Sequence, residues 1–373
     1  MSLNGSKRTF YKQFAQQGNG DALVAITPQE VALLTIITKL DLHENKVEEW
    51  MPREIVQTAQ RGLYSITQQD LDDLPSLTEE SAYEILVTAG IKDDNMPEQL
   101  YLHTLSKLYL RRAKYWKILC TQPFPTANQI APRSLLEYGN CDDALLFSWL
   151  SWRKLIYDID NRSAQETGYL FEPIVANCLG GDNLGSRNSV VRRLDESGNP
   201  TDRGRQVDCY VASTQTVYEL KMRMTIAASG QGRFSEELSF AREAKAAGLK
   251  PVLIVFDPTP SNRLSELSDA YKEAGGEVAT GDDAWNLLRR NAEEGMSHFL
   301  DKYVKPVIEA AGVGIRSQPD EIHLSITNGE LNVSNSANRM VVPEKLRTLD
   351  HGRPWSDDQF ASTRLSSNRD MSR

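Results

Sequence analysis

The stretch GRQVDCYVASTQTVYELKMRM at residues 204–224 has the pattern of a β-hairpin. On both sides of its centre, successive side chains alternate in character, which is typical of strands with two different faces. A turn centred on residues 213–214 pairs the strands so that Asp208 faces Glu219, and directly opposed Cβ atoms lie roughly 5 Å apart. Two carboxylates at that distance repel each other unless a cation lies between them. Lys221 shares their face, and the stretch therefore predicts a metal site on one face of the hairpin.

An aspartate on one strand, followed by Glu-x-Lys on the next, resembles the motif of the PD-(D/E)xK nuclease superfamily. Asp208 supplies the aspartate here, and Glu219-Leu220-Lys221 supplies the Glu-x-Lys. Within that superfamily the chain looks most like a type II restriction endonuclease. Val207 stands where the family name has proline. The alternative interpretation is a solvated strand face that carries charges of mixed sign.

The resemblance implies Mg²⁺-dependent hydrolysis of DNA. Asp208 and Glu219 would hold the Mg²⁺, a hard ion that prefers oxygen ligands, and the ion would neutralise the phosphodiester and acidify a bound water. Lys221 would orient or deprotonate the attacking water and stabilise the pentacovalent charge. A type II restriction endonuclease belongs to a restriction-modification system, cuts both strands of a short site in double-stranded DNA and leaves 5′-phosphate ends.

The elements expected around the hairpin match the core of that superfamily. A buried helix is expected over 168–181, a strand over 187–194, a helix over 235–247 and a strand over 251–256. The last of these, PVLIVF, is continuously apolar, as in strands buried on both faces. The order α-β-β-β-α-β covers roughly residues 163–257. The expected fold class is α/β (α+β), with a PD-(D/E)xK-like mixed central sheet flanked by helices and an additional N-terminal helical domain.

The superfamily usually has a glutamate on the helix before the hairpin, and Glu172 matches that place in both a catalytic and a metal-binding role. Pro173 complicates the match, because a residue before proline disfavours helical geometry. Either the helix kinks there, or it begins at Pro173 with Glu172 at its start. Glu166 is the alternative member of the site. Glu172 is otherwise explained as a helix-end carboxylate near the N-terminal dipole.

The net charge of −9 does not by itself indicate a nucleic-acid binder, but phosphate attraction is local and allows a basic cleft in an acidic protein. Arginine matches the O6 and N7 edge of guanine, so at least one of Arg187, Arg203 and Arg205 is expected to read a base. A solvated charged loop is the alternative for Arg192 and Arg193. The candidate DNA-binding residues are Arg187, Arg192, Arg193, Arg203, Arg205 and Arg223.

Three regions are expected along the chain. Residues 1–155 form a helical region for DNA recognition or dimerisation, residues 156–312 the catalytic domain, and residues 313–373 a hairpin and a polar tail. Asn328-Gly329 is a strong two-residue turn signal for that hairpin. The helical region ends in an aromatic-rich helix whose expected core residues are Leu145, Trp149, Trp152 and Tyr157.

Composition and segment patterns suggest the compartment and the partners. The chain has no apolar run long enough to cross a membrane, and its start, MSLNGSKRTFYKQF, lacks an apolar signal core. Four scattered cysteines fit a reduced, cytoplasmic (bacterial) setting. A homodimer is expected, because a site cut on both strands most often has two-fold symmetry. The alternatives are a structure-specific DNA repair or recombination nuclease of the same fold, and a catalytically inactive DNA-binding protein.

Overall fold

A computed structural model of the chain describes residues 3–18, 23–91, 97–222, 231–257, 259–314 and 321–343. Only the backbone is described at residues 164–167, 169–170, 231–233 and 312–314. The chain divides into two compact units. The first comprises Met1–Lys114 and Ala164–Ile315, and the second comprises Tyr115–Ser163 and Arg316–Arg373.

A mixed five-stranded sheet forms the centre of the first unit. Its strand order is β3-β6-β7-β8-β9, with antiparallel pairing of β3 to β6 and β6 to β7 and parallel pairing of β7 to β8 and β8 to β9. The strands are β3 Asp182–Leu184, β6 Val207–Val211, β7 Thr216–Lys221, β8 Lys250–Val255 and β9 Glu277–Thr280. The expected fold class, α/β with a mixed central sheet flanked by helices, is confirmed.

Strands β6 and β7 form the predicted hairpin in the predicted register. Cys209 pairs with Tyr218, and one step outward Asp208 therefore comes opposite Glu219. A 3-10 turn, η4 (Ala212–Thr214), joins the strands and is followed by Gln215, whose φ of 50° is left-handed. Because side chains alternate between faces, this register places the two carboxylates on the same side of the sheet.

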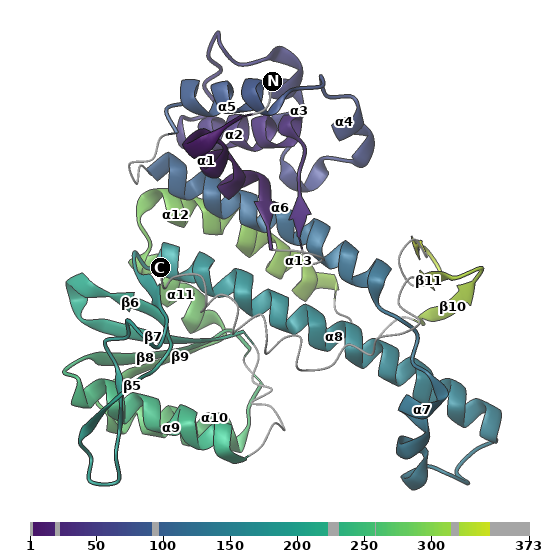
Figure 1. The fold of residues 1–373 in the computed structure, drawn as a ribbon, viewed down its shortest axis with the longest axis vertical. Helices are drawn as coiled ribbons and strands as arrows, with labels where there is room; N and C mark the ends of the chain where they lie inside the picture. The colour runs from purple at the N-terminus through teal and green to yellow at the C-terminus, as the bar shows by residue number, and fades with distance from the viewer. Residues whose placement is uncertain are drawn as a thin grey trace. The chain divides into compact units, whose positions relative to one another are not determined.

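Helices cover both faces of the sheet (Figure 1). Helices α9 (Gln231–Ala246) and α10 (Asn262–Glu273) pack on one face, and the C-terminal half of α8 (Asp143–Cys178) and α11 (Asp282–Asn291) pack on the other. Strand β8 contributes alternate residues to the two cores, with Val252 and Ile254 in one and Leu253 and Val255 in the other. It is therefore buried on both faces, as its apolar sequence predicts.

The N-terminal helices share a core with the sheet. Buried residues of α1, α2, α3, α5 and α6 belong to the same cluster as Cys209, Tyr218 and Ile254 of the sheet. The expected boundary at residue 155 therefore differs from the observed division, because α6 and α8 each run through both units. These helices are α1 Gly5–Ala15, α2 Pro28–Leu42, α3 Arg53–Ala59, α4 Gln68–Asp72, α5 Glu79–Thr88 and α6 Pro97–Thr121.

Shorter elements complete the first unit. Strands β1 (Gln16–Gln17) and β2 (Val24–Ala25) pair with each other, and η2 (Leu63–Ser65) is a single 3-10 turn. After α11 the chain continues as α12 (Glu294–Phe299), the π-helical segment η5 (Leu300–Val304) and α13 (Lys305–Gly314).

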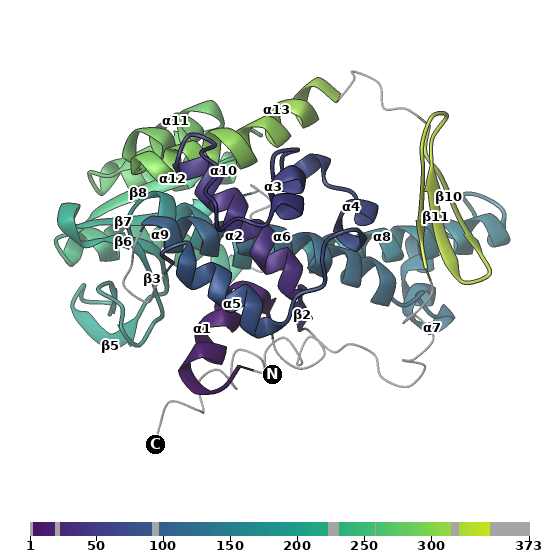
Figure 2. The ribbon, with the colours of Figure 1, turned by 90° about the horizontal axis from the view of Figure 1, so that it is seen from above.

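The second unit contains the predicted C-terminal hairpin. Strands β10 (His323–Thr327) and β11 (Glu330–Ser334) pair around Asn328 and Gly329, and β12 (Arg339–Val342) extends the sheet (Figure 2). Both turn residues have positive φ, 53° and 79°, as a two-residue hairpin loop requires. The remaining elements of this unit are α7 Ala127–Ile130, η3 Ala131–Leu136 and the adjoining parts of α6 and α8.

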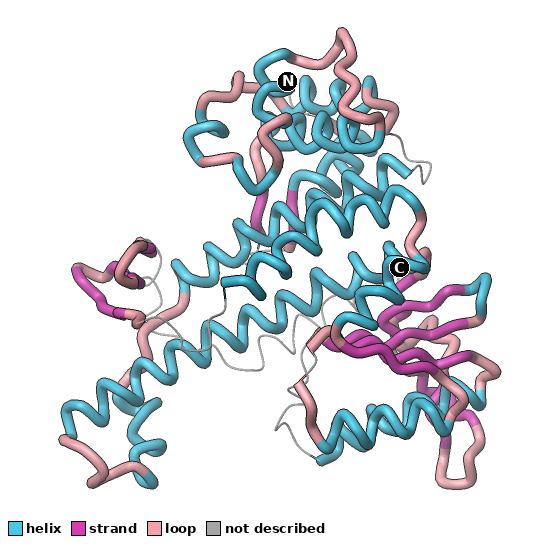
Figure 3. Tube along the Cα trace, turned by 180° about the vertical axis from the view of Figure 1, so that it is seen from behind, coloured by secondary structure: helices cyan, strands magenta, loops and turns pink. Residues whose placement is uncertain are grey.

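The expected strand over 187–194 is confirmed only at its end, as β4 (Arg192–Leu194), and its expected place in the central sheet is wrong. Strand β4 pairs with β5 (Pro200–Gly204) in a separate two-stranded ribbon, and the first strand of the central sheet is β3 (Figure 3). Strand β3 has only three residues, Asp-Asn-Leu, a sequence without alternation or β-branched side chains. Its pairing with β6, rather than its own propensity, makes it a strand.

Most of the aromatic-rich segment of α8 that was expected in the core is exposed. Leu145 is 61% exposed, Trp149 54% and Tyr157 58%, whereas Trp152 packs against a small cluster that includes Leu119. The described elements of the second unit are too few to cover every side of this helix. Among the described residues, no helix has the length and apolar character needed to cross a membrane.

Candidate active site

The hairpin fixes Asp208 at the centre of an acidic cluster. Asp208 is 8% exposed, and its Oδ2 atom accepts a hydrogen bond of 3.0 Å from the backbone N–H of Leu220 on the neighbouring strand. This bond holds the carboxylate against β7. The predicted pairing of the two strands therefore determines where the first acid of the motif lies.

Glu219 and Lys221 lie on β7, on the face that Asp208 shares. Their side chains are only 18% and 19% exposed, and the Lys221 Nζ atom lies 2.7 Å from Glu219 Oε1. Burial lowers the pKa of Lys221, but Glu219 and Glu237 raise it by more, and the net pKa lies above the usual lysine value. Lys221 is therefore a cation at neutral pH in this cluster.

Glu172 of α8 belongs to the same electrostatic cluster. Burial raises its pKa to about 7, with a further increase from the Glu219 charge, while Lys221 acts in the opposite direction. The pKa of Asp208 is raised well above its usual value by burial, then by Glu219 and Glu172. The structure thus brings together the three acids that the sequence analysis selected.

Helix α8 continues through Pro173. Glu172 therefore lies within a helix and not at its start, which removes the explanation of Glu172 as a carboxylate at a helix N-terminus. One turn earlier, a Cβ at Gly168 would come 3.4 Å from Glu172 Oε1, an ordinary van der Waals distance, so the carboxylate lies next to Gly168 on the helix. The side chain of Glu166, the alternative member of the site, lies outside the described residues.

The acid cluster has the chemistry of a divalent-cation site, although its side chains are not arranged around an ion. Within the described ranges, no three His, Cys, Asp or Glu side chains lie close enough to share one cation, and Glu219 is bonded to Lys221 instead. Burial, and then the neighbouring carboxylates, raise the pKa values of Asp208 and Glu172, and a bound cation would favour the ionised form of both acids. Carboxylate oxygens are the ligands that Mg²⁺ prefers, and these residues therefore fit such an ion.

Glu237 of α9 is a member of the site that the sequence analysis missed. Its Oε1 atom lies 3.2 Å from Lys221 Nζ, and its side chain is 18% exposed. No motif spacing marks this position, because Glu237 lies on α9, the helix after the hairpin, and not on the hairpin strands. The packing of α9 on the sheet brings it there.

The predicted DNA-binding arginines have different surroundings. Arg187 and Arg203 are exposed. Arg192 donates a hydrogen bond of 3.1 Å to a backbone carbonyl of β5, and Arg193 makes an ion pair of 2.8 Å with a glutamate of α9. Arg223 lies outside the described residues.

Arg205 is buried, with only 8% of its surface exposed, and connects the end of the β4–β5 ribbon to α9. Its Nε atom lies 2.5 Å from Glu243 Oε2, and Nη2 donates to Ser239 Oγ at 2.6 Å and to the Glu236 carbonyl at 3.2 Å. The guanidinium is thus committed to protein partners. We therefore do not retain Arg205 as a candidate for base reading.

Replacing Arg205 by alanine should destabilise the fold by about 3–5 kcal/mol, because it leaves the buried Glu243 carboxylate without its cation. Arg193→Ala is the matched control. It removes an ion pair with partners that are 38% and 49% exposed, which should cost about 1 kcal/mol or less. Urea unfolding measures both free energies. Equal losses in the two variants would contradict a structural role specific to Arg205.

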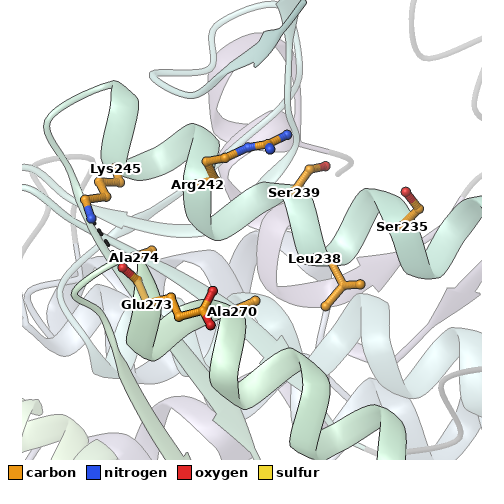
Figure 4. A pocket seen from close by; sticks show the side chains of 8 residues that line it. All are labelled: Ser235, Leu238, Ser239, Arg242, Lys245, Ala270, Glu273 and Ala274. Atoms are coloured by element: carbon orange, nitrogen blue, oxygen red, sulfur yellow. Dashed lines mark hydrogen bonds between the residues drawn. The ribbon is translucent and has the colours of Figure 1, made fainter. Parts of the chain in front are cut away.

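A groove between α9 and α10 is separate from the acid cluster (Figure 4). Its volume is about 460 Å³, and the Lys245 ammonium donates to the Glu273 carbonyl at one end. On a helix with 3.6 residues per turn, Glu237 projects from the opposite side of α9 to the groove residues. The groove is lined by Ser235, Leu238, Ser239, Arg242, Lys245, Ala270, Glu273 and Ala274.

Comparisons with known proteins identify the family of the chain. A model of the ApaLI-like restriction endonuclease family matches residues 51–305, a range that contains every acid of the cluster and Lys221. The type II restriction enzyme ApaLI of Acetobacter pasteurianus is 53% identical to this chain over 209 residues. The match covers 55% of each protein, and the chain thus spans about half the length of this curated relative. No solved structure matches the chain at a significant level. The chain belongs to the family of ApaLI-like restriction endonucleases.

Proposed function

We propose that the chain is a type II restriction endonuclease that hydrolyses both strands of a short DNA site in a Mg²⁺-dependent reaction. The observation that carries this proposal is the convergence of Asp208, Glu219, Glu172 and Lys221 in a chain that belongs to a restriction endonuclease family. A solvated strand face does not explain this convergence, because Asp208 is buried and the others are largely buried.

In this proposal Asp208, Glu219 and Glu172 hold the divalent ion. The ion supplies positive charge to the scissile phosphate and makes water a better nucleophile at neutral pH. In the metal-free protein the carboxylate neighbours of Lys221 raise its pKa, which favours the protonated form. It therefore acts as a cation that orients the attacking water and stabilises the charge of the transition state, and not as a base. The products carry 5′-phosphate ends.

Digestion of phage DNA with Mg²⁺ tests this function. A type II restriction endonuclease gives discrete bands whose ends map to one repeated sequence. A smear, or a preference for branched DNA, would instead indicate a repair or recombination nuclease. The absence of cutting with Mg²⁺ or Mn²⁺ would indicate a DNA-binding protein without catalysis.

We further propose that the enzyme acts as a homodimer. A site that is cut on both strands most often has two-fold symmetry, and a symmetric dimer brings one hairpin to each scissile phosphate. Sedimentation of the chain with its site DNA distinguishes this assembly from a monomer. A soluble enzyme that protects a bacterial cell from foreign DNA would act in the cytoplasm, and fractionation of the source cells tests that location.

Arg187 and Arg203 are the strongest candidates for DNA contact, because both are exposed and both flank the strands of the hairpin. Alanine at a base-reading position should cost about 1–3 kcal/mol of binding and relax specificity at one base pair. Alanine at a phosphate contact should weaken binding to all sequences alike and reduce the salt dependence. Binding isotherms at several salt concentrations separate the two roles. If both variants bind and cut normally, recognition belongs to the N-terminal helices.

A further inference from the structure

The Lys221 ammonium contacts two carboxylates, only one of which belongs to the Glu-x-Lys motif. Glu219 Oε1 lies 2.7 Å from Nζ, and Glu237 Oε1 lies 3.2 Å from it. The first contact comes from the same strand, whereas the second comes from α9, the helix that connects β7 to β8. Lys221 is thus held from two directions.

Fold stability alone does not explain the buried position of the Glu237 carboxylate. Glu237 Oε2 is buried and has no hydrogen-bond partner among the described residues, and the Oε1 contact with Lys221 is the carboxylate's only hydrogen bond in those ranges. A buried carboxylate oxygen without a partner costs free energy. Such departures from good packing concentrate at functional sites.

The motif glutamate has a competing task under the proposed function. If Glu219 holds the divalent ion, its charge is shared with that ion and its hold on Lys221 weakens. Glu237 is then the remaining carboxylate that forms an ion pair with the ammonium group among the described residues. Without Glu237, no carboxylate in contact with the Lys221 ammonium group would offset its repulsion from the ion.

We propose that Glu237 is a positioning residue of the active site, which fixes the Lys221 ammonium beside the scissile phosphate while Glu219 engages the divalent ion. The proposal rests on the nuclease function proposed above and deepens it. Glu237 itself touches neither DNA nor the ion. Its effect on cleavage passes through Lys221.

Glu237→Gln tests the proposal, since glutamine preserves shape and removes the charge. Under single-turnover conditions on the mapped site, the cleavage rate should fall about 10- to 100-fold, the scale for losing a group that orients a catalytic ligand. The affinity for that DNA in Ca²⁺ should be unchanged. Glu237→Asp, which keeps the charge on a shorter side chain, should recover part of the rate.

Glu277→Gln is the control, because it breaks an exposed Glu–Lys pair, 2.7 Å from Glu277 to Lys250, at the opposite end of the parallel strands from Lys221. It should cleave at the wild-type rate. The positioning role would be overturned if Glu277→Gln lost as much cleavage rate as Glu237→Gln. It would also be overturned if losses in DNA affinity and in the free energy of unfolding accounted for the lower rate of Glu237→Gln. A Glu237→Gln variant that cleaves normally would overturn it as well.

A second readout is independent of cleavage. In Ca²⁺-loaded protein labelled with ¹³C at lysine Cε, where Glu219 is engaged by the ion, the Lys221 signal, identified by its loss in Lys221→Arg, should show restricted motion in the wild type and greater motion in Glu237→Gln. If the wild type cuts no DNA but this contrast is present, the proposed nuclease function fails while the contact between Glu237 and Lys221 stands. If the enzyme cuts and the contrast is missing, the positioning role is wrong.

Discussion

Replacing Asp208, Glu219 or Lys221 by alanine should each reduce DNA cleavage on the order of 10³-fold or more, the scale expected for groups that act on the transition state. The physical reason is their convergence on one face of the β6–β7 hairpin, where Lys221 lies 2.7 Å from Glu219 and the pKa of Asp208 is raised by burial and by the neighbouring acids. Single-turnover cleavage of a duplex with one mapped site measures the loss.

The alanine variants should still fold and bind DNA. Asp208 is a buried carboxylate with a raised pKa, and its removal relieves repulsion from the neighbouring acids, which offsets the loss of its hydrogen bond from the Leu220 N–H. Ca²⁺ should support DNA binding by the wild type without cleavage, because its larger and looser coordination shell positions water poorly. Ordinary turnover by any one variant would remove that residue from the site.

The second large effect is expected at Glu172. Glu172→Gln should weaken Mg²⁺-dependent cleavage about 10- to 100-fold, whereas Glu166→Gln should not. In the metal-free wild type the pKa of Glu172 is about 7, raised first by burial and then by Glu219. A cation must displace that proton, and the Mg²⁺ concentration for half-maximal cleavage should therefore fall as pH rises from 6 to 8. Cleavage rates at several pH values and Mg²⁺ concentrations measure this dependence.

The same shift has a consequence for stability with a definite sign. The pKa of Glu172 in the folded protein lies above its ordinary value of 4.5, so folding favours the protonated form. Its contribution to stability is present below pH 4.5 and is lost as pH rises through 7. Glu172→Gln should remove that loss, measured by urea unfolding in EDTA.

The assignment would move to Glu166 if the Mg²⁺ concentration for half-maximal cleavage were the same at pH 6 and pH 8 and Glu166→Gln were defective in cleavage.

The part of the site that follows from local sequence was predictable. Alternation over the hairpin fixed the faces, and the turn fixed the register that brings Asp208 opposite Glu219. A one-residue slip would have moved the acids to different faces, so the register carries most of the prediction. Glu172 was predicted from its position on the helix before the hairpin. It lies within α8 because the helix continues through Pro173.

The parts that depend on tertiary packing were not predictable in the same way. Strand β3 exists because β6 pairs with it, and its own residues carry no strand pattern. Arg205 has the sequence surroundings of a DNA contact, yet Glu243 from a helix 38 residues later holds it in a buried ion pair. Glu237 reaches Lys221 across 16 residues of sequence, and no spacing rule connects the two positions.

The most direct test of this account is calorimetric titration of Ca²⁺, which should not support cleavage, into the protein bound to its site DNA, with wild type and Asp208→Asn compared at pH 8. Asparagine keeps the size of the side chain and removes the charge that the proposed ion requires. The account predicts saturable binding by the wild type and a loss of at least tenfold in affinity for Asp208→Asn, since removing a group that only orients a metal ligand already costs about 10- to 100-fold. Equal affinity in the two proteins would show that the hairpin acids do not hold the ion, and would contradict the account at its centre.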